Sequence, residues 1–258
     1  MLWGFFRGKS TREKLRLLHQ AGFRAFEFTD WHREDLETLA STIRELGLTL
    51  NCINGNGGVA GPSNKSPLDP RQRREFIAEV TASIAVLRKL GGRALIILTG
   101  NTLPHLSRQR QRQNCIAALK EVAPLAQEAN VTLLLEPLNV QVDHPGYFLV
   151  HSDEAFEIID QVNSPSVKVL FDIYHQQISE GNLITTITKN IARIGHFHIA
   201  DVPGRHEPGT GEINYGNILQ AIVQSGYRGF IGLEFIPSRD DFLVLQQVKE
   251  LGRRAGIQ

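Results

Sequence analysis

Short apolar runs alternate with longer amphipathic segments along the whole chain, and this alternation constrains the fold more than any other feature. Such alternation is typical of βα units, in which parallel strands form a sheet and helices cover it. The apolar runs predict strands at residues 2–6, 25–28, 49–53, 94–98, 132–136, 167–172, 195–199 and 229–235. The intervening segments predict helices at residues 10–21, 34–46, 71–90, 108–129, 153–162, 182–194 and 217–224, and a closing helix from about residue 240 onward.

Two local features refine these helices. Ser10 is followed three residues later by Glu13, which predicts a capping box at the start of the first helix. Pro124 lies inside the segment 108–129 and predicts a kink or a break there, because proline removes a backbone hydrogen bond.

Eight strand–helix units in 258 residues match the size of a closed (β/α)8 TIM barrel. The sequence therefore predicts an α/β fold with a single barrel domain over residues 1–258. An open doubly wound sheet is the alternative, but it would be expected to carry a nucleotide-binding glycine motif after the first strand, where this chain reads RGKSTRE. The later segment NGNGGVAGPSNKSP does not form a phosphate loop either, and we interpret it as a flexible loop of the active site.

Four of the predicted strands end on a side chain that suits a hard metal ion. Glu136, Asp172, His198 and Glu234 belong to the runs TLLLE, VKVLFD, GHFHI and FIGLE. The carboxyl ends of parallel barrel strands meet on one face, so these side chains are expected to converge there. Three carboxylates and one imidazole favour one divalent ion, Mn²⁺, Mg²⁺ or Co²⁺, over a metal that prefers thiolate ligands.

Each of these residues taken alone has a simpler interpretation. A glutamate at the end of a strand is often a solvated loop residue, and an aspartate before a loop is often a turn former. The conjunction is more specific, because all four residues occupy the same place on the last four strands, which are neighbours in a barrel. Four such ligands also leave coordination positions for substrate oxygens.

Two further histidines lie close to these strand ends. His175 follows Asp172 by three residues and can reach the metal or a substrate oxygen, with a surface loop histidine as the alternative. His196 is two residues before His198 and therefore faces the same side, one layer deeper. There it is expected to order the core or a carboxylate that neighbours the metal ligands.

The loop after the seventh predicted strand, DVPGRHEPGTGEINY, carries Arg205 between a glycine and a histidine. Its planar guanidinium is suited to binding a carboxylate or sugar hydroxyls. The competing interpretation is a surface salt bridge from Arg205 to Glu207 or Glu212.

Other residues can line the pocket. Asn139 and Asp143 follow the fifth predicted strand, although polar residues are expected in any loop. Trp3, Phe5 and Phe6 are expected either to form an apolar wall of the site or to belong to the barrel core.

Composition excludes several classes of protein. A formal net charge of +1 gives no electrostatic reason to expect nucleic acid or an anionic membrane as a partner, and no apolar run is long enough to span a bilayer. Cys52 and Cys115 form no CxxC pair, so we expect reduced thiols in a cytoplasmic protein. The apolar part of MLWGFFRGKS is too short for a signal peptide, and the sequence leaves open whether residues precede Met1.

The segments LLLEPLN, DHPGYF, VLFDIYHQQISEGNL, IGHFHIADVPGRHEPGTGEINY and GFIGLEFIPSRD resemble the hydroxypyruvate isomerase family. That family is part of the larger group of xylose isomerase-like barrels, which also holds the ketose 3-epimerases. The resemblance covers the chain from about residue 2 to the end of the eighth predicted strand and is densest over residues 132–239. It implies a TIM barrel that isomerises a sugar or a hydroxy acid with a divalent metal ion.

Matched by position, the resemblance implies that Glu136, Asp172 and Glu234 are carboxylate ligands of the metal and that His198 is the fourth ligand. The best-known hydroxypyruvate isomerases have glutamine at the fourth place, whereas the ketose 3-epimerases have histidine. The resemblance therefore supports the metal site that the group shares, but it does not decide which substrate the chain acts on.

The resemblance also implies that His175 and Arg205 contact the substrate, and Asn139 is predicted to do so from the loop beside them. The epimerases carry a further glutamate in that loop, where this chain has Asn139, Gln141 and Asp143. The match to the epimerases is therefore incomplete as well.

The implied reaction begins with removal of a proton from the carbon next to a carbonyl. A divalent cation stabilises the enediolate, and carboxylates take and return the proton, for which Glu136 and Glu234 are the candidates. Return to the adjacent carbon is isomerisation, here of hydroxypyruvate to tartronate semialdehyde or of a similar 2-oxo acid. Return to the same carbon from the opposite face is epimerisation of a ketose such as D-tagatose, D-psicose or L-ribulose.

Two other classes of protein remain as alternatives. A phosphodiesterase of the abasic-site endonuclease type would need more histidines at the strand ends and a basic face. A non-catalytic sugar-binding barrel would not require the intact set of metal ligands. The family often forms oligomers, but no heptad repeat in this sequence decides whether a homo-oligomer forms.

Overall fold

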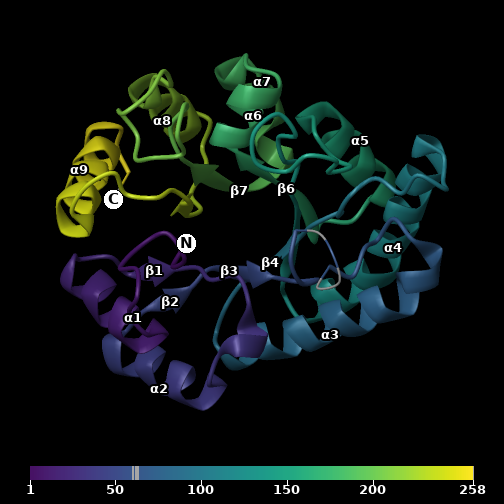
Figure 1. Cartoon of the computed structure of the whole chain (residues 1–258), viewed down its shortest axis with the longest axis horizontal. Helices are drawn as coiled ribbons and strands as arrows, with labels where there is room; N and C mark the ends of the chain where they lie inside the picture. Colours follow the sequence, from purple (N-terminus) through teal and green to yellow (C-terminus); the bar gives the residue numbers. More distant parts are fainter. Residues whose placement is uncertain (60, 62–63, 258) are drawn as a thin grey trace.

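The computed structural model describes residues 1–59, 61 and 64–257, and it shows parallel strands that curl around a centre with helices on the outside (Figure 1). One sheet pairs β1 with β2, and a second has the order β3-β4-β5-β6-β7-β8, with every neighbouring pair parallel. The strands are β1 Ala25–Phe26, β2 Thr49–Leu50, β3 Cys52–Asn54, β4 Ala94–Ile97, β5 Thr132–Leu135, β6 Val167–Asp172, β7 Ile194–Ile199 and β8 Ile231–Leu233. The predicted α/β class with a curled parallel sheet is confirmed.

The helices are close to their predicted positions. They are α1 Thr11–Gln20, α2 Leu36–Leu46, α3 Arg73–Lys89, α4 Arg108–Glu128, α5 Ser152–Val162, α6 Ile173–Ser179, α7 Leu183–Asn190, α8 Tyr215–Gln224 and α9 Asp241–Arg254, with short 3-10 turns at Trp31–Arg33, Pro70–Gln72 and Ile191–Arg193. The capping box between Ser10 and Glu13 is present. Pro124 lies within α4 without ending it, so the predicted break is wrong.

The prediction of a strand at residues 2–6 is wrong. This segment forms turns, and Phe6 has a φ of +48°, which is incompatible with extended backbone. The segment still bridges the ends of the sheet, because the backbone nitrogen of Leu2 donates to the carbonyl of Glu27 at 2.8 Å and that of Met1 donates to the carbonyl of Leu233 at 2.7 Å. These two bonds connect the beginning and the end of the barrel.

A helix that the sequence did not predict follows β6 directly. Asp172 is the last residue of β6 and also the N-cap of α6, since its Oδ1 accepts hydrogen bonds from the backbone nitrogens of Tyr174 and His175. The segment DIYHQQIS therefore forms a helix where a loop was expected, and this turn of helix places His175 directly above the strand end.

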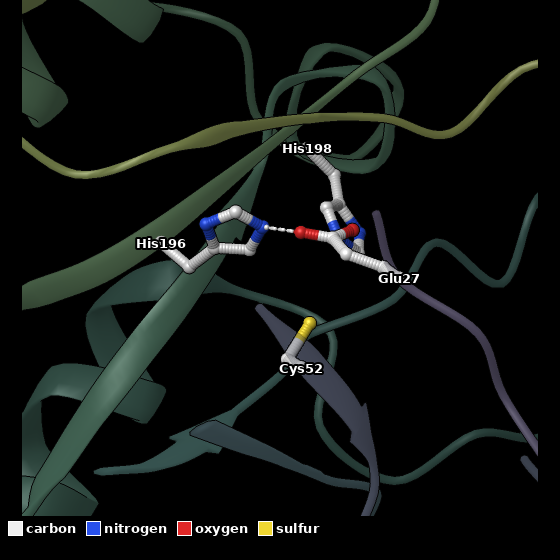
Figure 2. A group of neighbouring side chains, drawn as sticks. All are labelled: Glu27, Cys52, His196 and His198. Carbon is white, nitrogen blue, oxygen red and sulfur yellow. Dashed lines mark hydrogen bonds and ion pairs between the residues drawn. The ribbon is translucent and has the colours of Figure 1, made fainter. Parts of the chain in front are cut away.

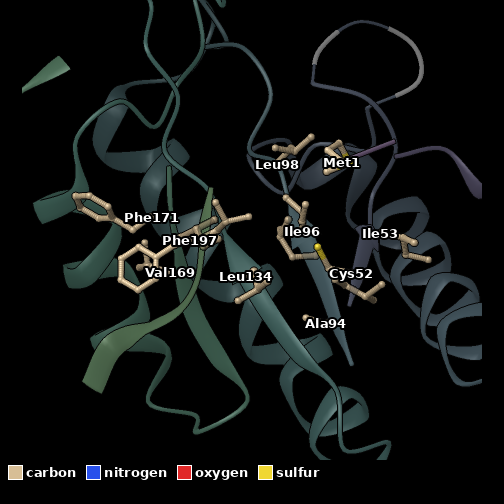
Figure 3. Packing of buried hydrophobic residues seen from close by; sticks show 14 of the residues in the cluster. Met1, Cys52, Ile53, Ala94, Ile96, Leu98, Leu134, Val169, Phe171 and Phe197 are labelled. Carbon is tan, nitrogen blue, oxygen red and sulfur yellow. The ribbon is translucent and has the colours of Figure 1, made fainter. Parts of the chain in front are cut away.

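Apolar side chains fill both faces of the sheet (Figure 3). β4 is buried along its whole length, as expected for parallel strands that are covered on both sides. Phe171 and Phe197 pack edge to face between neighbouring strands, with ring centroids 6.2 Å apart. Polar side chains interrupt this apolar packing mainly at one place, where the inner face of the barrel reaches the carboxyl ends of the strands.

Two remaining predictions concern single segments. Cys52 and Cys115 are free and buried, as expected for reduced thiols.

In the glycine-rich segment, Ala60, Pro62 and Ser63 lie outside the described residues. Asn56 of the same segment donates to the carbonyl of Leu98 at 2.8 Å. None of the helices in the described part of the chain has the length and apolar character that a membrane span requires.

Candidate active site at the carboxyl ends of the strands

Four titratable side chains converge where β5, β6 and β8 end. Glu136, Asp172, His175 and Glu234 each offer one oxygen or nitrogen, and these atoms all lie within 4.8 Å of one another. We call this group the mouth cluster. It contains three of the four predicted metal ligands and adds His175, so the expected convergence of residues distant in the sequence is observed.

His198, the fourth predicted ligand, lies directly beneath the mouth cluster. It is the register partner of Asp172 across β6 and β7. Its Nδ1 is 3.1 Å from Oε2 of Glu234 and 3.8 Å from Oε1 of Glu136. One edge of the ring therefore faces the carboxylates of the mouth cluster, and the other edge faces away from them.

The three carboxylates of the mouth cluster repel one another in a site shielded from water. Burial and the charge of Glu234 raise the pKa of Asp172 to about 7, and the same two causes raise the pKa of Glu136 well above its usual range. Burial also opposes ionisation of Glu234, but the charges of His198 and Arg205 outweigh it and hold the pKa of Glu234 well below its usual range. Negative charge is therefore in excess unless cations offset it.

Arg205 is one cation that offsets this charge. Its guanidinium donates to Oε2 of Glu234 at 2.9 Å and lies 3.5 Å from Asp143, and the rings of Trp3 and Tyr174 flank it. The side chain is only 15% exposed, so the alternative of a surface salt bridge to the acidic residues of its own loop is wrong. The residue has a φ of +55°, which turns its side chain back over the mouth cluster.

The tautomer of His175 follows from its contacts with Asn139. Oδ1 of Asn139 accepts from two backbone nitrogens, those of Val142 and Asp143, which fixes its amide group with Nδ2 toward His175. Nδ2 then donates to Nδ1 of His175 at 2.7 Å. Burial and nearby Arg205 lower the pKa of His175 well below its usual range, so the ring is neutral and carries its hydrogen on Nε2.

His175 is fully buried, so the alternative of a surface histidine is wrong. Its Nε2 has no hydrogen-bond partner among the described residues and lies 3.6 Å from Oδ2 of Asp172. A nitrogen that carries a hydrogen cannot coordinate a metal ion. The ring therefore presents a hydrogen-bond donor to the mouth cluster.

The aromatic residues near the start of the chain divide between two roles. Trp3 donates its indole N–H to Oε1 of Glu234 at 3.3 Å and forms part of the wall of the mouth. Phe5 and Phe6 are buried and pack on Phe235 and Phe242, with ring centroids 5.1 and 5.4 Å apart. The predicted apolar wall is thus provided by Trp3, while its two neighbours belong to the core.

A second polar group lies on the side of the His198 ring that faces away from the mouth cluster, and Figure 2 shows Glu27, Cys52, His196 and His198 from it. We call it the deep cluster; its members are Glu27, Asn51, Cys52, His196 and His198. Glu27 accepts from Nε2 of His196 at 2.7 Å, from Nε2 of His198 at 3.0 Å and from Nδ2 of Asn51 at 2.8 Å. His196 contacts a carboxylate behind the ligands, as predicted.

The sequence analysis missed Glu27, although a signal was available. In the run AFEF, the glutamate alternates with phenylalanines at positions where a barrel strand has no solvated face. A charge there has to be paired inside the barrel. Gly232 of β8 leaves the space for it, since a Cβ atom on this glycine would lie 2.6 Å from Oε2 of Glu27 and 2.5 Å from the ring of His198.

The donor atoms of the mouth cluster fit a hard divalent cation. They are carboxylate oxygens at the ends of β5, β6 and β8, and Oδ2 of Asp172 is buried without a hydrogen-bond partner in the described part of the chain. An orphaned carboxylate oxygen among like charges is expected where a cation belongs. Nδ1 of His198 adds a nitrogen next to two of these oxygens.

The chain is similar to known proteins in both sequence and structure. The family described as xylose isomerase-like TIM barrel matches residues 15–252. Hydroxypyruvate isomerase of Escherichia coli (strain K12) is 35% identical over 220 residues, which cover 84% of each chain. 2-Oxo-tetronate isomerase of Cupriavidus necator is 34% identical over 218 residues, which cover 84% of this chain and 83% of that protein.

A solved structure is similar over nearly the whole length. The crystal structure of an AP endonuclease, family 2, from Brucella melitensis has a TM-score of 0.90 and 31% identity, and the match covers 96% of this chain and 95% of that one. The similarity includes both ends of the curled sheet.

Proposed function

The chain belongs to the xylose isomerase-like TIM barrel family and is an isomerase, and from this premise we propose that it interconverts a short 2-oxo acid and its hydroxyaldehyde isomer with one divalent metal ion. Hydroxypyruvate and tartronate semialdehyde are the proposed pair. The observation that carries the proposal is the mouth cluster, in which the buried carboxylates of Glu136 and Asp172 and the partly buried carboxylate of Glu234 meet at the ends of β5, β6 and β8, with an unpartnered oxygen on Asp172.

We assign the metal ligands to Glu136, Asp172, Glu234 and Nδ1 of His198. A divalent cation held there would stabilise the negative charge that develops on the substrate oxygens during proton transfer. The charges of Glu234 and Glu27 outweigh the effect of burial and hold the pKa of His198 well above its usual range. The ring would thus release its Nδ1 proton on binding the metal, because a ligand nitrogen has to be deprotonated.

Glu136 is the proposed base that takes the proton from the carbon next to the carbonyl. Burial raises the basicity of its carboxylate, and a catalytic pKa near neutrality suits proton transfer at neutral pH. Glu234 lies on the other side of the mouth cluster, where Trp3 and Arg205 hold both of its oxygens. This carboxylate stays ionised and is proposed to orient the substrate and, in the alternative reaction, to act as the second base.

His175 and Arg205 are proposed to bind the substrate, with Asn139 orienting His175. The Nε2 hydrogen of His175 can be donated to a substrate oxygen, and can stabilise charge on it. The guanidinium of Arg205 has a fork of donors that matches the carboxylate of a 2-oxo acid. A ketose carries no such carboxylate, which favours the acid as the substrate.

A ketose 3-epimerase is the second candidate, and His198 is the residue that favours it. Epimerisation needs a base on each face of the substrate, and the mouth cluster offers Glu136 and Glu234. A phosphodiesterase, the class that the description of the Brucella melitensis protein names, is disfavoured by a mouth cluster with one histidine and by a formal net charge of +1.

The test is a proton-exchange assay in D₂O. The protein is loaded with Mn²⁺ or Mg²⁺ and offered hydroxypyruvate, D-fructose, D-tagatose and L-ribulose in parallel, and products are read by NMR after a chelator has removed the metal. We expect conversion of hydroxypyruvate to tartronate semialdehyde, with the ketoses unchanged.

Each other result has a definite meaning. A new C3 epimer of a ketose with deuterium at C3, and inert hydroxypyruvate, would replace the proposed reaction by epimerisation. Equal turnover before and after the metal is removed would contradict the metal requirement. The variant Glu136→Gln is the matched control, because it keeps the shape of the side chain and removes its charge and basicity.

A further inference from the structure

We propose that Glu27 is a positioning residue for the metal site, acting through His198 from inside the barrel. This inference rests on the proposed function, because it requires Nδ1 of His198 to be a metal ligand. Glu27 precedes Phe28 on the segment after β1, whereas His198 is in β7, and closure of the barrel brings the two side chains to within 3.0 Å. In the described part of the chain, no hydrogen bond or ion pair joins Glu27 to a residue of the mouth cluster, and His198 is bonded to both.

The contacts of Glu27 are all with hydrogen-bond donors. Nε2 of His196 lies 2.7 Å from Oε1, Nδ2 of Asn51 lies 2.8 Å from the same oxygen, and Nε2 of His198 lies 3.0 Å from Oε2. The residue is 4% exposed, so water cannot replace these partners. A buried carboxylate has only acceptors to offer, and both imidazole rings therefore have to carry a hydrogen on Nε2.

This requirement determines what His198 presents to the mouth cluster. With the hydrogen on Nε2 held by Glu27, the proton that a metal has to displace is the one on Nδ1, and its release leaves a lone pair on the nitrogen that faces Glu234 at 3.1 Å and Glu136 at 3.8 Å. A ligand histidine whose second nitrogen donates to a carboxylate is held in one orientation and becomes a more basic ligand. Glu27 thus selects both the tautomer and the direction of the proposed ligand.

The carboxylate and the imidazoles of the deep cluster satisfy one another without an ion. The residues of this cluster form another group whose donor atoms could surround an ion, but Glu27 lies 2.7–3.0 Å from the two imidazole nitrogens, which is hydrogen-bond distance. The nitrogens point at the carboxylate oxygens and share hydrogens with them. A metal at that place would have to displace the hydrogens that the two rings donate to Glu27.

The first experiment measures Mn²⁺ affinity by isothermal titration calorimetry on the whole protein. Glu27→Gln keeps the shape but offers one acceptor oxygen where three donors converge, so we expect the affinity to fall about 10- to 100-fold. Asp69→Asn is the matched control, because Asp69 is also a buried carboxylate but pairs with Arg71 rather than with the cluster, and its affinity should equal that of the wild type. An affinity of Glu27→Gln within twofold of the wild type would overturn the proposal.

The second experiment does not depend on whether a variant folds. Long-range ¹H–¹⁵N correlation spectra of the Mg²⁺-loaded wild type report which nitrogen of each histidine carries hydrogen, and we expect Nε2–H for both His196 and His198. A hydrogen on Nδ1 of His198 in the Mg²⁺-loaded protein would refute the role of Glu27. Failure of the wild type to bind either ion would instead refute the proposed function, so the two failures are distinguishable.

Discussion

The mouth cluster and the deep cluster share the chemistry of carboxylate and imidazole, yet their internal contacts are opposite. In the deep cluster, one carboxylate accepts from three donors at 2.7 to 3.0 Å. In the mouth cluster, three carboxylates lie close to one another. There, Oδ2 of Asp172 and Nε2 of His175 have no hydrogen-bond partner among the described residues. The carboxylate of the deep cluster has its hydrogen-bond partners without a ligand, whereas atoms of the mouth cluster lack partners until a ligand binds.

This contrast separates two uses of buried charge. A satisfied network rigidifies the barrel and orients its neighbours, whereas an unsatisfied one stores an unfavourable energy that a bound cation and substrate can release. His198 belongs to both groups, since its two ring nitrogens face opposite clusters. Changes in the mouth cluster should therefore affect metal binding and chemistry directly, and changes in the deep cluster should affect stability and, through His198, metal binding.

The largest expected effect comes from removing the base at the mouth. Glu136→Gln should lower kcat by about 10²- to 10⁴-fold, the range for loss of general-base catalysis. The melting temperature should not fall, because the substitution removes a carboxylate that its neighbours make costly to ionise. Steady-state kinetics and thermal unfolding check the two statements, and a variant with more than a tenth of wild-type kcat would contradict the assignment.

The next effect concerns the orientation of the donor at the mouth. Asn139→Ala removes the 2.7 Å side-chain donor to Nδ1 of His175 and leaves only the backbone nitrogen of residue 139, at 3.3 Å, to hold the tautomer. We expect kcat/KM to fall about 10- to 100-fold, as for loss of a partner that orients a site histidine. Mn²⁺ affinity should stay within a few-fold of the wild type, and an equal loss in both quantities would assign His175 to the metal instead.

A smaller effect should come from crowding the deep cluster. Gly232→Ala places a methyl group within 2.6 Å of Glu27 and His198, and overpacking of this kind costs about 1–3 kcal/mol of unfolding free energy. Gly252→Ala in α9 is the control, because its Cβ would meet nothing closer than 3.7 Å, and we expect it to stabilise the protein by about 0.5–1 kcal/mol. Urea unfolding measures both, and equal stabilities would show that the deep cluster is loosely packed.

The stability of the metal-free protein should fall as the pH rises from about 5 to 8. Glu136, Asp172 and His198 have raised pKa values and so bind protons more tightly in the folded protein than in the unfolded chain. The lowered pKa values of His175 and His144 oppose this slope, because the unfolded chain binds those protons more tightly, so the fall reflects the excess of three groups over two. The lowered pKa of Glu27 contributes no slope in this range, because both states are already ionised there. We expect a loss of at least about 1 kcal/mol, equivalent to less than one unit of pKa shift.

Saturating Mg²⁺ should remove this slope, because metal binding displaces the same protons. Urea unfolding with and without a chelator at several pH values provides the comparison. A metal-free protein that becomes more stable toward alkaline pH would show that the mouth cluster is not under charge repulsion.

The smallest effect concerns the reactivity of the two thiols, which measures how well each buried region excludes a reagent. Burial raises the pKa of Cys115 to about 12, and it raises the pKa of Cys52 as well. We expect both thiols to react with a disulfide reagent far more slowly in the native protein than in urea. Gly232→Ala should speed the reaction of Cys52 and leave Cys115 unchanged, and equal acceleration of both would indicate general unfolding instead.

The sequence predicted most of what is local in this molecule. Apolar runs located the strands, and the residue that closes each run located Glu136, Asp172 and Glu234, because strand direction and barrel topology bring those ends together. The run AFEF indicates that Glu27 is paired inside the barrel, but its partners could not be predicted, since they depend on how strands from opposite ends of the chain approach across the barrel. The tautomer of His175 is likewise invisible in the sequence, because it follows from the orientation of one amide in a loop.

Two errors have similar causes. Residues 2–6 look like a strand, but the backbone turns at Phe6, and only two hydrogen bonds of the expected ladder form. The helix α6 was missed because Asp172 was assigned to a single role. Its carboxylate both caps α6 through Oδ1 and leaves Oδ2 facing the mouth cluster.

The proposed ligands sit at or next to the ends of strands, whereas Asn139, His175 and Arg205 sit in the connections that follow three of those strands. The two sets can therefore change independently over evolutionary time. Substitutions in one of these connections could change the substrate of a descendant of this chain, while the metal ligands stay the same. Within such a lineage, Glu27 would be expected to persist with His198 longer than any residue that touches the substrate.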